Sequence, residues 1–226
     1  MASYESLLPE IIPMVSSCPD TLIENSIRSA TIELCEKAKV YQVELDPITA
    51  IANLFEYDLE PPSGTVVHEI LWATYDGKDL EPITSALLEQ RLPQWRQSGN
   101  QSTPEYFVKQ SQSLFYLAPV PNETKASAVL IRAILKPTHT STSCSNDVMN
   151  DYRDTIINGA LLRLLRLPGR EFTDYAAAGV YSALFNEGIV EAEKRGRQTE
   201  TRVTRKVAYG GLGKNYRLTR TKYSRG

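Results

Sequence analysis

The chain has 226 residues, of which 42% are hydrophobic and 23% charged, and its formal net charge is −2. These fractions are typical of a globular protein and exclude a chain that is disordered throughout. No apolar run approaches the roughly 20 residues of a membrane-spanning helix. Residues 1–15 lack a basic leader, so we expect a protein that is made and kept in a cytosol, away from any membrane.

Charge is divided unevenly along the chain. Residues 198–226, the basic arm, hold eight Lys or Arg residues and one acidic residue, Glu200, a net charge of +7. The rest of the chain therefore carries −9. An acidic body with a basic tail is a charge asymmetry that the function has to explain.

Residues 1–39 are predicted to supply the first part of a helical bundle. The apolar residues of 7–12 are interrupted by prolines and predict a short helical turn or an extended lead-in that lies on the body. After Pro19 and Asp20, apolar residues recur at helical spacing from Ile23 to Ala38, which predicts a long amphipathic helix.

Residues 40–138 change to a period of two, which is typical of strands. We expect strands near 41–45, 55–59, 66–74, 106–110, 114–117 and 128–136, and one short helix at 84–91. The pair Asp76 and Gly77 favours a tight hairpin turn. This region is predicted to form an inserted antiparallel β-sandwich or barrel.

Residues 139–197 are predicted to complete the bundle. A polar linker leads into the strongest helix signal of the chain, residues 146–167, which Pro168 and Gly169 end. Arg163 and Arg166 lie in its last turn, where cations complement the helix dipole. A further helix over 173–196, capped by Thr173 or Asp174, follows. The fold class is therefore α+β: a helical bundle from both ends of the chain, an inserted β domain and an extended C-terminal arm.

The chain shows no pattern typical of an enzyme, a metal site or a cofactor site. Cys18, Cys35 and Cys144 are odd in number and widely spaced, which favours unpaired thiols and assembly that does not depend on oxidation. His68 and His139 do not form ligand spacing with them. His139 and Cys144 are close in sequence, but a polar linker offers no scaffold for a nucleophile and its base, so an exposed loop is the preferred interpretation.

Several strings, in this order, resemble one known family over about residues 7–196. They are Leu7-Leu8-Pro9-Glu10 before Cys18-Pro19, Ala30-Thr31-Ile32-Glu33-Leu34-Cys35-Glu36, Tyr57-Asp58-Leu59 with Pro61, Asp76-Gly77-Lys78-Asp79-Leu80 ahead of Trp95, Leu117-Ala118-Pro119-Val120-Pro121, and Ile157-Asn158-Gly159-Ala160-Leu161. Together they resemble the head-to-tail adaptor, or connector, proteins of tailed bacteriophages, which are similar to the tail tubular protein A of short-tailed phages.

The resemblance implies a non-enzymatic structural protein of the virion neck, made in the host cytoplasm. It implies a ring, commonly of twelve copies, that joins the portal protein to a tail tube, nozzle or other tail protein. The genome would pass through an axial channel without specific binding, and we expect the acidic body to face solvent or this channel, where like charge keeps DNA from sticking.

The resemblance also implies that the basic arm reaches the portal. The residues expected to dock combine cations with tyrosines: Arg202, Arg205, Lys206, Tyr209, Lys214, Tyr216, Arg217 and Arg220. Such side chains can pair with an acidic surface. Two alternatives stay open: a solubilising tail, and a nucleic-acid-binding accessory protein whose arm grips phosphates and stacks bases.

Overall fold

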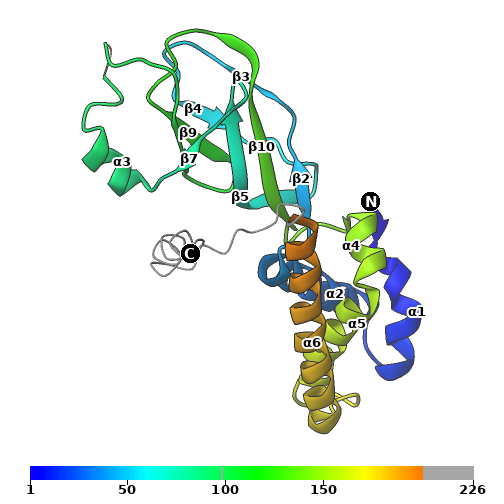
Figure 1. The fold of residues 1–226 in the computed structure, drawn as a ribbon. Coiled ribbons are helices and arrows are strands. Elements are labelled where there is room, and N and C mark those ends of the chain that lie inside the picture. The colour runs from blue at the N-terminus through cyan, green and yellow to red at the C-terminus, as the bar shows by residue number, and fades with distance from the viewer. Residues whose placement is uncertain (98, 201–226) are drawn as a thin grey trace, which may run out of the picture.

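The computed structural model describes residues 1–97 and 99–200, which form a helical bundle and a β domain side by side (Figure 1). The predicted α+β class is confirmed: helices from both ends of the described chain meet in the bundle, and the β domain is inserted between them. The expected extended arm lies outside the described residues, apart from the end of the last helix.

The bundle is built from helices that are distant in the sequence. They are α1 (Leu8–Ile11), α2 (Asp20–Ala38), α4 (Asn146–Asp151), α5 (Arg153–Leu165) and α6 (Tyr175–Glu200), with short 3-10 turns at Tyr4–Leu7 and Ile12–Met14. The long helix predicted after Pro19 is α2, and it ends where Lys39 turns into the left-handed region at φ 54°. Asp174 is the cap of α6, since its carboxylate accepts the N–H groups of Ala176 and Ala177 at 2.9 and 3.0 Å.

The N-terminal lead-in lies on the body, as expected. Its first residues, Ala2–Ser3 (β1), pair antiparallel with Ser143–Cys144 (β11). Leu7 and Ile11 are fully buried in the bundle core. The chain start is thus fixed to the segment that leads into α4.

The single helix predicted over residues 146–167 is wrong in one respect, because it is broken at Tyr152. The backbone of Tyr152 leaves the helical region at φ −121° and ψ 25°, which separates α4 from α5. Arg153, the first residue of α5, then reaches α1 and its preceding turn: its guanidinium donates to Glu10 Oε1 at 2.7 Å and to Ser6 O at 2.9 Å. The apolar spacing continues through the break, so periodicity alone does not reveal it.

The β domain consists of two sheets that curl around one core, which agrees with the predicted sandwich or barrel (Figure 1). The first contains β2 (Gln42–Glu44), β3 (Ile48–Ala50), β5 (Thr65–Tyr75), β6 (Lys78–Asp79) and β10 (Lys125–Pro137). The second contains β4 (Glu56–Asp58), β7 (Glu81–Pro82), β8 (Tyr106–Lys109) and β9 (Leu114–Ala118), in the order β4-β9-β8-β7. The pairs are antiparallel except β7 with β8.

Turn chemistry places the hairpin between β5 and β6 where the sequence predicts it. Asp76 and Gly77 have positive φ values of 49° and 75°, which a two-residue primed turn requires.

The short helix expected at 84–91 is α3 (Ser85–Arg91), capped by Thr84. It covers a second small core around Leu88 and Trp95.

The bundle and the β domain share one continuous apolar core. Polar contacts reinforce the junction between α2 and the long strands: Lys136 Nζ lies 2.5 Å from Glu36 Oε1, and Lys39 pairs with Glu69. The position of the bundle relative to the sheets is therefore fixed by packing.

Candidate partner-binding surfaces

The predicted docking residues of the basic arm all lie outside the described residues. They are Arg202, Arg205, Lys206, Tyr209, Lys214, Tyr216, Arg217 and Arg220. The structure does describe the helix that leads to them. Near its end, a Cβ at Gly196 would lie 3.4 Å from the backbone oxygen of Ala38, so α6 ends beside the chain's entry into the β domain (Figure 1).

Two glycines bring α6 close to the rest of the bundle. A Cβ on Gly159 of α5 would lie 2.6 Å from the Phe185 ring of α6 and 2.8 Å from Cβ of Ala30 in α2. A Cβ on Gly188 of α6 would lie 2.4 Å from Oγ1 of Thr155 in α5. These distances are shorter than real carbon contacts, so the three helices meet only because both residues lack a side chain.

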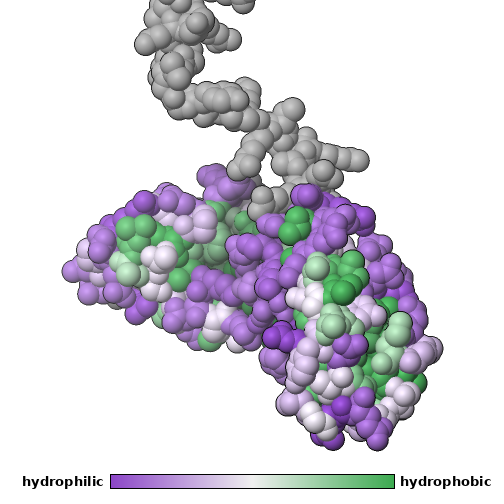
Figure 2. Space-filling view, turned by 90° about the horizontal axis from the view of Figure 1, so that it is seen from below, coloured by the Kyte–Doolittle hydropathy of each residue, from purple (hydrophilic) through white to green (hydrophobic). Residues whose placement is uncertain are grey.

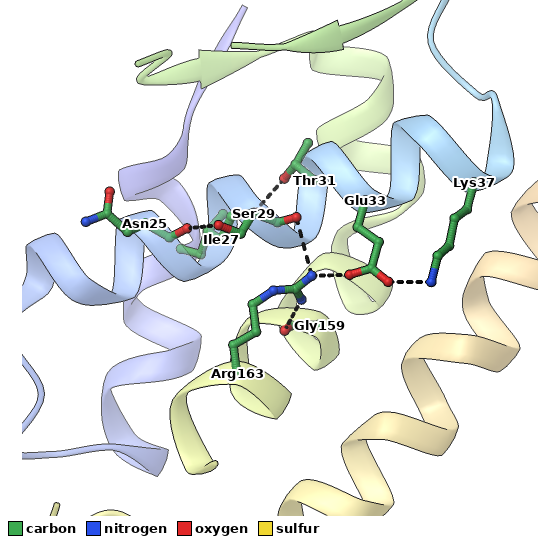
Figure 3. Close-up of polar contacts among 8 residues, drawn as sticks. All are labelled: Asn25, Ile27, Ser29, Thr31, Glu33, Lys37, Gly159 and Arg163. Carbon is green, nitrogen blue, oxygen red and sulfur yellow. Dashed lines mark hydrogen bonds and ion pairs between the residues drawn. The ribbon is translucent and has the colours of Figure 1, made fainter. Parts of the chain in front are cut away.

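Arg163 fixes the same crossing through polar contacts (Figure 3). Its guanidinium donates to Gly159 O at 2.6 Å and pairs with Glu33 of α2, whose carboxylate also lies 2.5 Å from Lys37 Nζ. It lies over the ring of Phe185 at 5.5 Å. Arg163 was expected to complement the helix dipole, and in the structure it also joins α5 to α2 and α6.

The firmly held α6 presents a second apolar face to solvent. Its buried stripe is Ala178, Phe185, Ile189 and Ala192. On the opposite side, Val180 and Leu184 are 60% and 42% exposed, with Ala183 and Glu187 also exposed. We call Val180, Ala183, Leu184 and Glu187 the α6 outer face. Figure 2 shows apolar surface on the helical lobe among polar residues.

The α6 outer face was not predicted from the sequence, although its signal is present there. Val180 and Leu184 are four residues apart and fall between the members of the predicted stripe. A helix with apolar residues on two sides offers a second face for packing, which no described part of the chain covers.

The β domain has a groove of about 360 Å³ between the segment after β2 and strand β4. Its acidic lining residues are Asp46, Glu56, Asp58 and Glu60, all exposed, and we call this hollow the acidic groove. Its apolar lining includes Ile48 and Leu54. None of the four carboxylates makes an ion pair within residues 1–97 and 99–200.

A further hollow of about 580 Å³ lies beside Trp95 and α3. Next to it, the guanidinium of Arg96 lies 5.6, 4.7 and 5.9 Å from the ring centroids of Phe55, Trp95 and Tyr116. The three rings also contact one another. The rings and the guanidinium together cover the second core.

The thiols and imidazoles do not come together as a catalytic pair. Cys144 is buried and His139 is exposed. The partner of Cys144 is Cys35: a hydrogen bond between the two thiols, together with burial, raises the pKa of Cys35, and the same bond lowers the pKa of Cys144. All three cysteines are free in the structure, as predicted.

Neither a metal cluster nor a membrane span is found in the part of the chain that the structure describes. No three His, Cys, Asp or Glu side chains there are grouped as metal ligands. No described helix combines the length and the apolar character that crossing a bilayer requires.

Comparison with known proteins identifies a family. The family model described as SU10 adaptor protein matches residues 4–208, while no curated protein matches the chain. Proteins of this family are structural phage adaptors of the virion neck that associate with other head or tail proteins. Because the match covers most of its length, the chain belongs to the SU10 adaptor protein family and is a phage adaptor protein.

Proposed function

We propose that this adaptor forms a ring between the portal protein and the tail and leaves an axial channel for the genome. The family match over residues 4–208 carries the proposal. Twelve copies, as in the connectors related to tail tubular protein A that the sequence resembles, is the copy number we propose. The tail-side partner is a tail tube, a nozzle or another tail protein.

Lateral contact between neighbouring copies is assigned to the α6 outer face. Val180 and Leu184 offer apolar area to a partner, and the close crossings at Gly159 and Gly188 hold their helix rigidly. A contact between two unlike patches of identical copies closes into a ring when the rotation permits. Because Val180 and Leu184 are 60% and 42% exposed, burying what remains exposed would contribute roughly 1 kcal/mol for each side chain.

The basic arm is the proposed portal-docking element. The cations and tyrosines from Arg202 to Arg220 would pair with carboxylates of the portal and anchor in its surface. The body, with a net charge of −9 outside the arm, would let the genome pass because like charge opposes binding.

Ring formation is tested by electron microscopy of the purified protein. We expect rings for the natural chain and dispersed subunits for the double variant Val180→Asp and Leu184→Asp. The matched control is Leu87→Asp on α3, where an apolar side chain 39% exposed lies far from α6 in the sequence. Intact rings in the double variant would contradict the α6 contact, and their absence from the natural protein would contradict the ring itself.

Portal docking is tested with the full chain carrying Arg202→Glu, Arg205→Glu and Lys206→Glu. Binding to portal-bearing heads should weaken strongly at low salt and less at high salt, because screening already reduces the attraction there. The ring should still form in this variant. Unchanged binding at every salt concentration would refute docking through these cations.

A further inference from the structure

The acidic groove has no part in the ring contact or in portal docking as proposed above, yet it has the features of a docking site. Beside the groove, Ile51 and Leu54 are 47% and 37% exposed. Apolar side chains beside a hollow of about 360 Å³ can anchor a peptide.

One wall of the groove is an unpaired strand edge. Strand β4 is the outermost strand of its sheet and pairs only with β9 among the described strands. Tyr57 pairs with Phe115 of β9, and the neighbouring carbonyl of Phe55 and N–H of Leu59 also bond toward β9. By the alternation of antiparallel pairing, the backbone groups of Glu56 and Asp58 point away from it. Such an edge is a template for an added strand.

The charge of the groove specifies a basic occupant. No Lys or Arg occurs between Lys39 and Lys78 in the sequence, so its carboxylates have no nearby cation in their own segment. The acidic hollow between α4, α5 and α6 differs, because Arg153 and Arg195 line it together with Asp151, Asp154 and Glu191. The β-domain groove, in contrast, combines carboxylates with a lining that has no cation.

The chain itself contains an occupant of matching chemistry. Residues 201–226 hold eight cations and no acidic side chain. If the first part of this segment is extended, Val203, Val207 and Tyr209 fall on one side together with Arg205, and Arg202 and Lys206 fall on the other. These residues follow α6, whose end lies beside Ala38, close in sequence to β2 and the groove segment. A chain of 26 residues spans up to about 85 Å when extended, which gives ample reach on a subunit of this size.

We propose that the acidic groove of the free adaptor holds the basic arm of the same copy, added as a strand along the edge of β4. The apolar and tyrosine side chains of the arm pack beside Ile48 and Leu54, and its cations pair with the groove carboxylates. Portal docking then requires the arm to leave the acidic groove and bind the acidic surface of the portal. The groove therefore keeps the arm from binding other polyanions, DNA included, before the portal is met.

Zero-length carbodiimide crosslinking of the full-length protein without portal tests the contact. Bonds should form from Lys206 or Lys214 to Asp46, Glu56, Asp58 or Glu60, and far less to Asp151, Asp154, Glu171 or Glu191, which are also exposed. A mixture of isotope-labelled and unlabelled protein identifies bonds within one copy. Bonds spread evenly over both sets, or formed only between copies, would overturn the proposal.

Tryptic cleavage of the arm gives a readout that does not depend on crosslinking. Neutralising the groove with Asp46→Asn, Glu56→Gln, Asp58→Asn and Glu60→Gln should speed cleavage about fivefold or more at low salt, because paired cations are released. The control with Asp151→Asn, Asp154→Asn, Glu171→Gln and Glu191→Gln should cleave as the natural protein does. Equal rates in all three proteins would refute the groove as the arm's site while leaving the ring and portal proposals untouched.

Discussion

In the bundle, helices far apart in the sequence meet through residues with little or no side chain, whereas the β domain packs through large aromatic rings. Gly159 and Ala30 let α2, α5 and α6 cross closely. In the β domain, the rings of Tyr57 and Phe115 lie 5.6 Å apart, and those of Phe55 and Trp95 5.3 Å apart. The stability of the bundle should therefore respond most to added side-chain volume. The stability of the β domain should respond most to whether the polar atoms of its large buried side chains are hydrogen-bonded.

The largest expected effect comes from adding one methyl group to the bundle. Gly159→Ala should lower the free energy of unfolding by about 3 kcal/mol, because its Cβ would overlap Phe185 and Ala30. For a chain of this size the melting temperature should fall by about 6 to 12 °C. Thermal unfolding followed by circular dichroism measures it.

The matched control is Gly179→Ala on the exposed side of α6, where a Cβ would meet nothing within 4 Å. This change should raise stability by about 0.5 to 1 kcal/mol, since alanine is the better helix former. If Gly179→Ala lowered the free energy of unfolding as much as Gly159→Ala, the helix crossing would not be the reason why residue 159 is a glycine.

A smaller effect is expected from two hydroxyl deletions in the β domain. The Tyr57 hydroxyl donates to Leu54 O at 2.9 Å and accepts from Ile51 N–H at 3.1 Å, so Tyr57→Phe should cost about 1 to 2 kcal/mol. The buried Tyr75 hydroxyl has no partner among the described residues, so Tyr75→Phe should be neutral or stabilise by up to about 1 kcal/mol. Denaturant unfolding of both variants compares them directly, and destabilisation by Tyr75→Phe would show that its hydroxyl is bonded.

The smallest effect concerns pH and the Glu33 carboxylate of the bundle. Burial raises its pKa, but hydrogen bonds and charge from Lys37 and Arg163 outweigh this and leave it below the usual 4.5. A lowered pKa means that the contribution is present above pH 4.5 and is lost as pH falls through the lowered value. Glu33→Gln should therefore cost about 0.5 to 1 kcal/mol at pH 7 and nearly nothing at pH 3.

The control for the pH effect is Glu24→Gln on the same helix, whose carboxylate makes no ion pair within the described residues. Melting temperatures of the three proteins between pH 7 and pH 3 measure the difference. The same pH dependence in Glu33→Gln as in the natural protein would contradict the assigned role of the Arg163 contacts.

The sequence predicted the elements whose signal is local and long. The helix after Pro19 and the turn at Asp76 and Gly77 follow from apolar spacing and from positive φ requirements. The two-residue strands β1, β7 and β11 could not be predicted, because their pairing depends on partners more than 20 residues away or on tertiary packing. The break at Tyr152 is hidden for a related reason, since Arg153 is directed toward α1 by the fold.

The candidate surfaces were predictable only in part. The run without Lys or Arg between residues 39 and 78 is visible in the sequence. That Asp46 lies across a groove from Glu56 and Asp58 is not, because the path from β2 to β4 decides it. Likewise, Val180 and Leu184 stand out only after the opposite side of α6 is known to be buried.

The pairing of β2 with β10 has a consequence for how the chain is made. Gln42 lies opposite Ile134, so the inserted domain begins and ends at neighbouring points. During synthesis α2 emerges long before α5, so the side of α2 that packs on α5 stays uncovered until α5 has been made. Once the insertion folds, the loop to be closed between them shrinks from about 110 residues to roughly twenty, which reduces the entropic cost by about 1.4 kcal/mol. Folding of the β domain thereby brings the second half of the bundle close to the first.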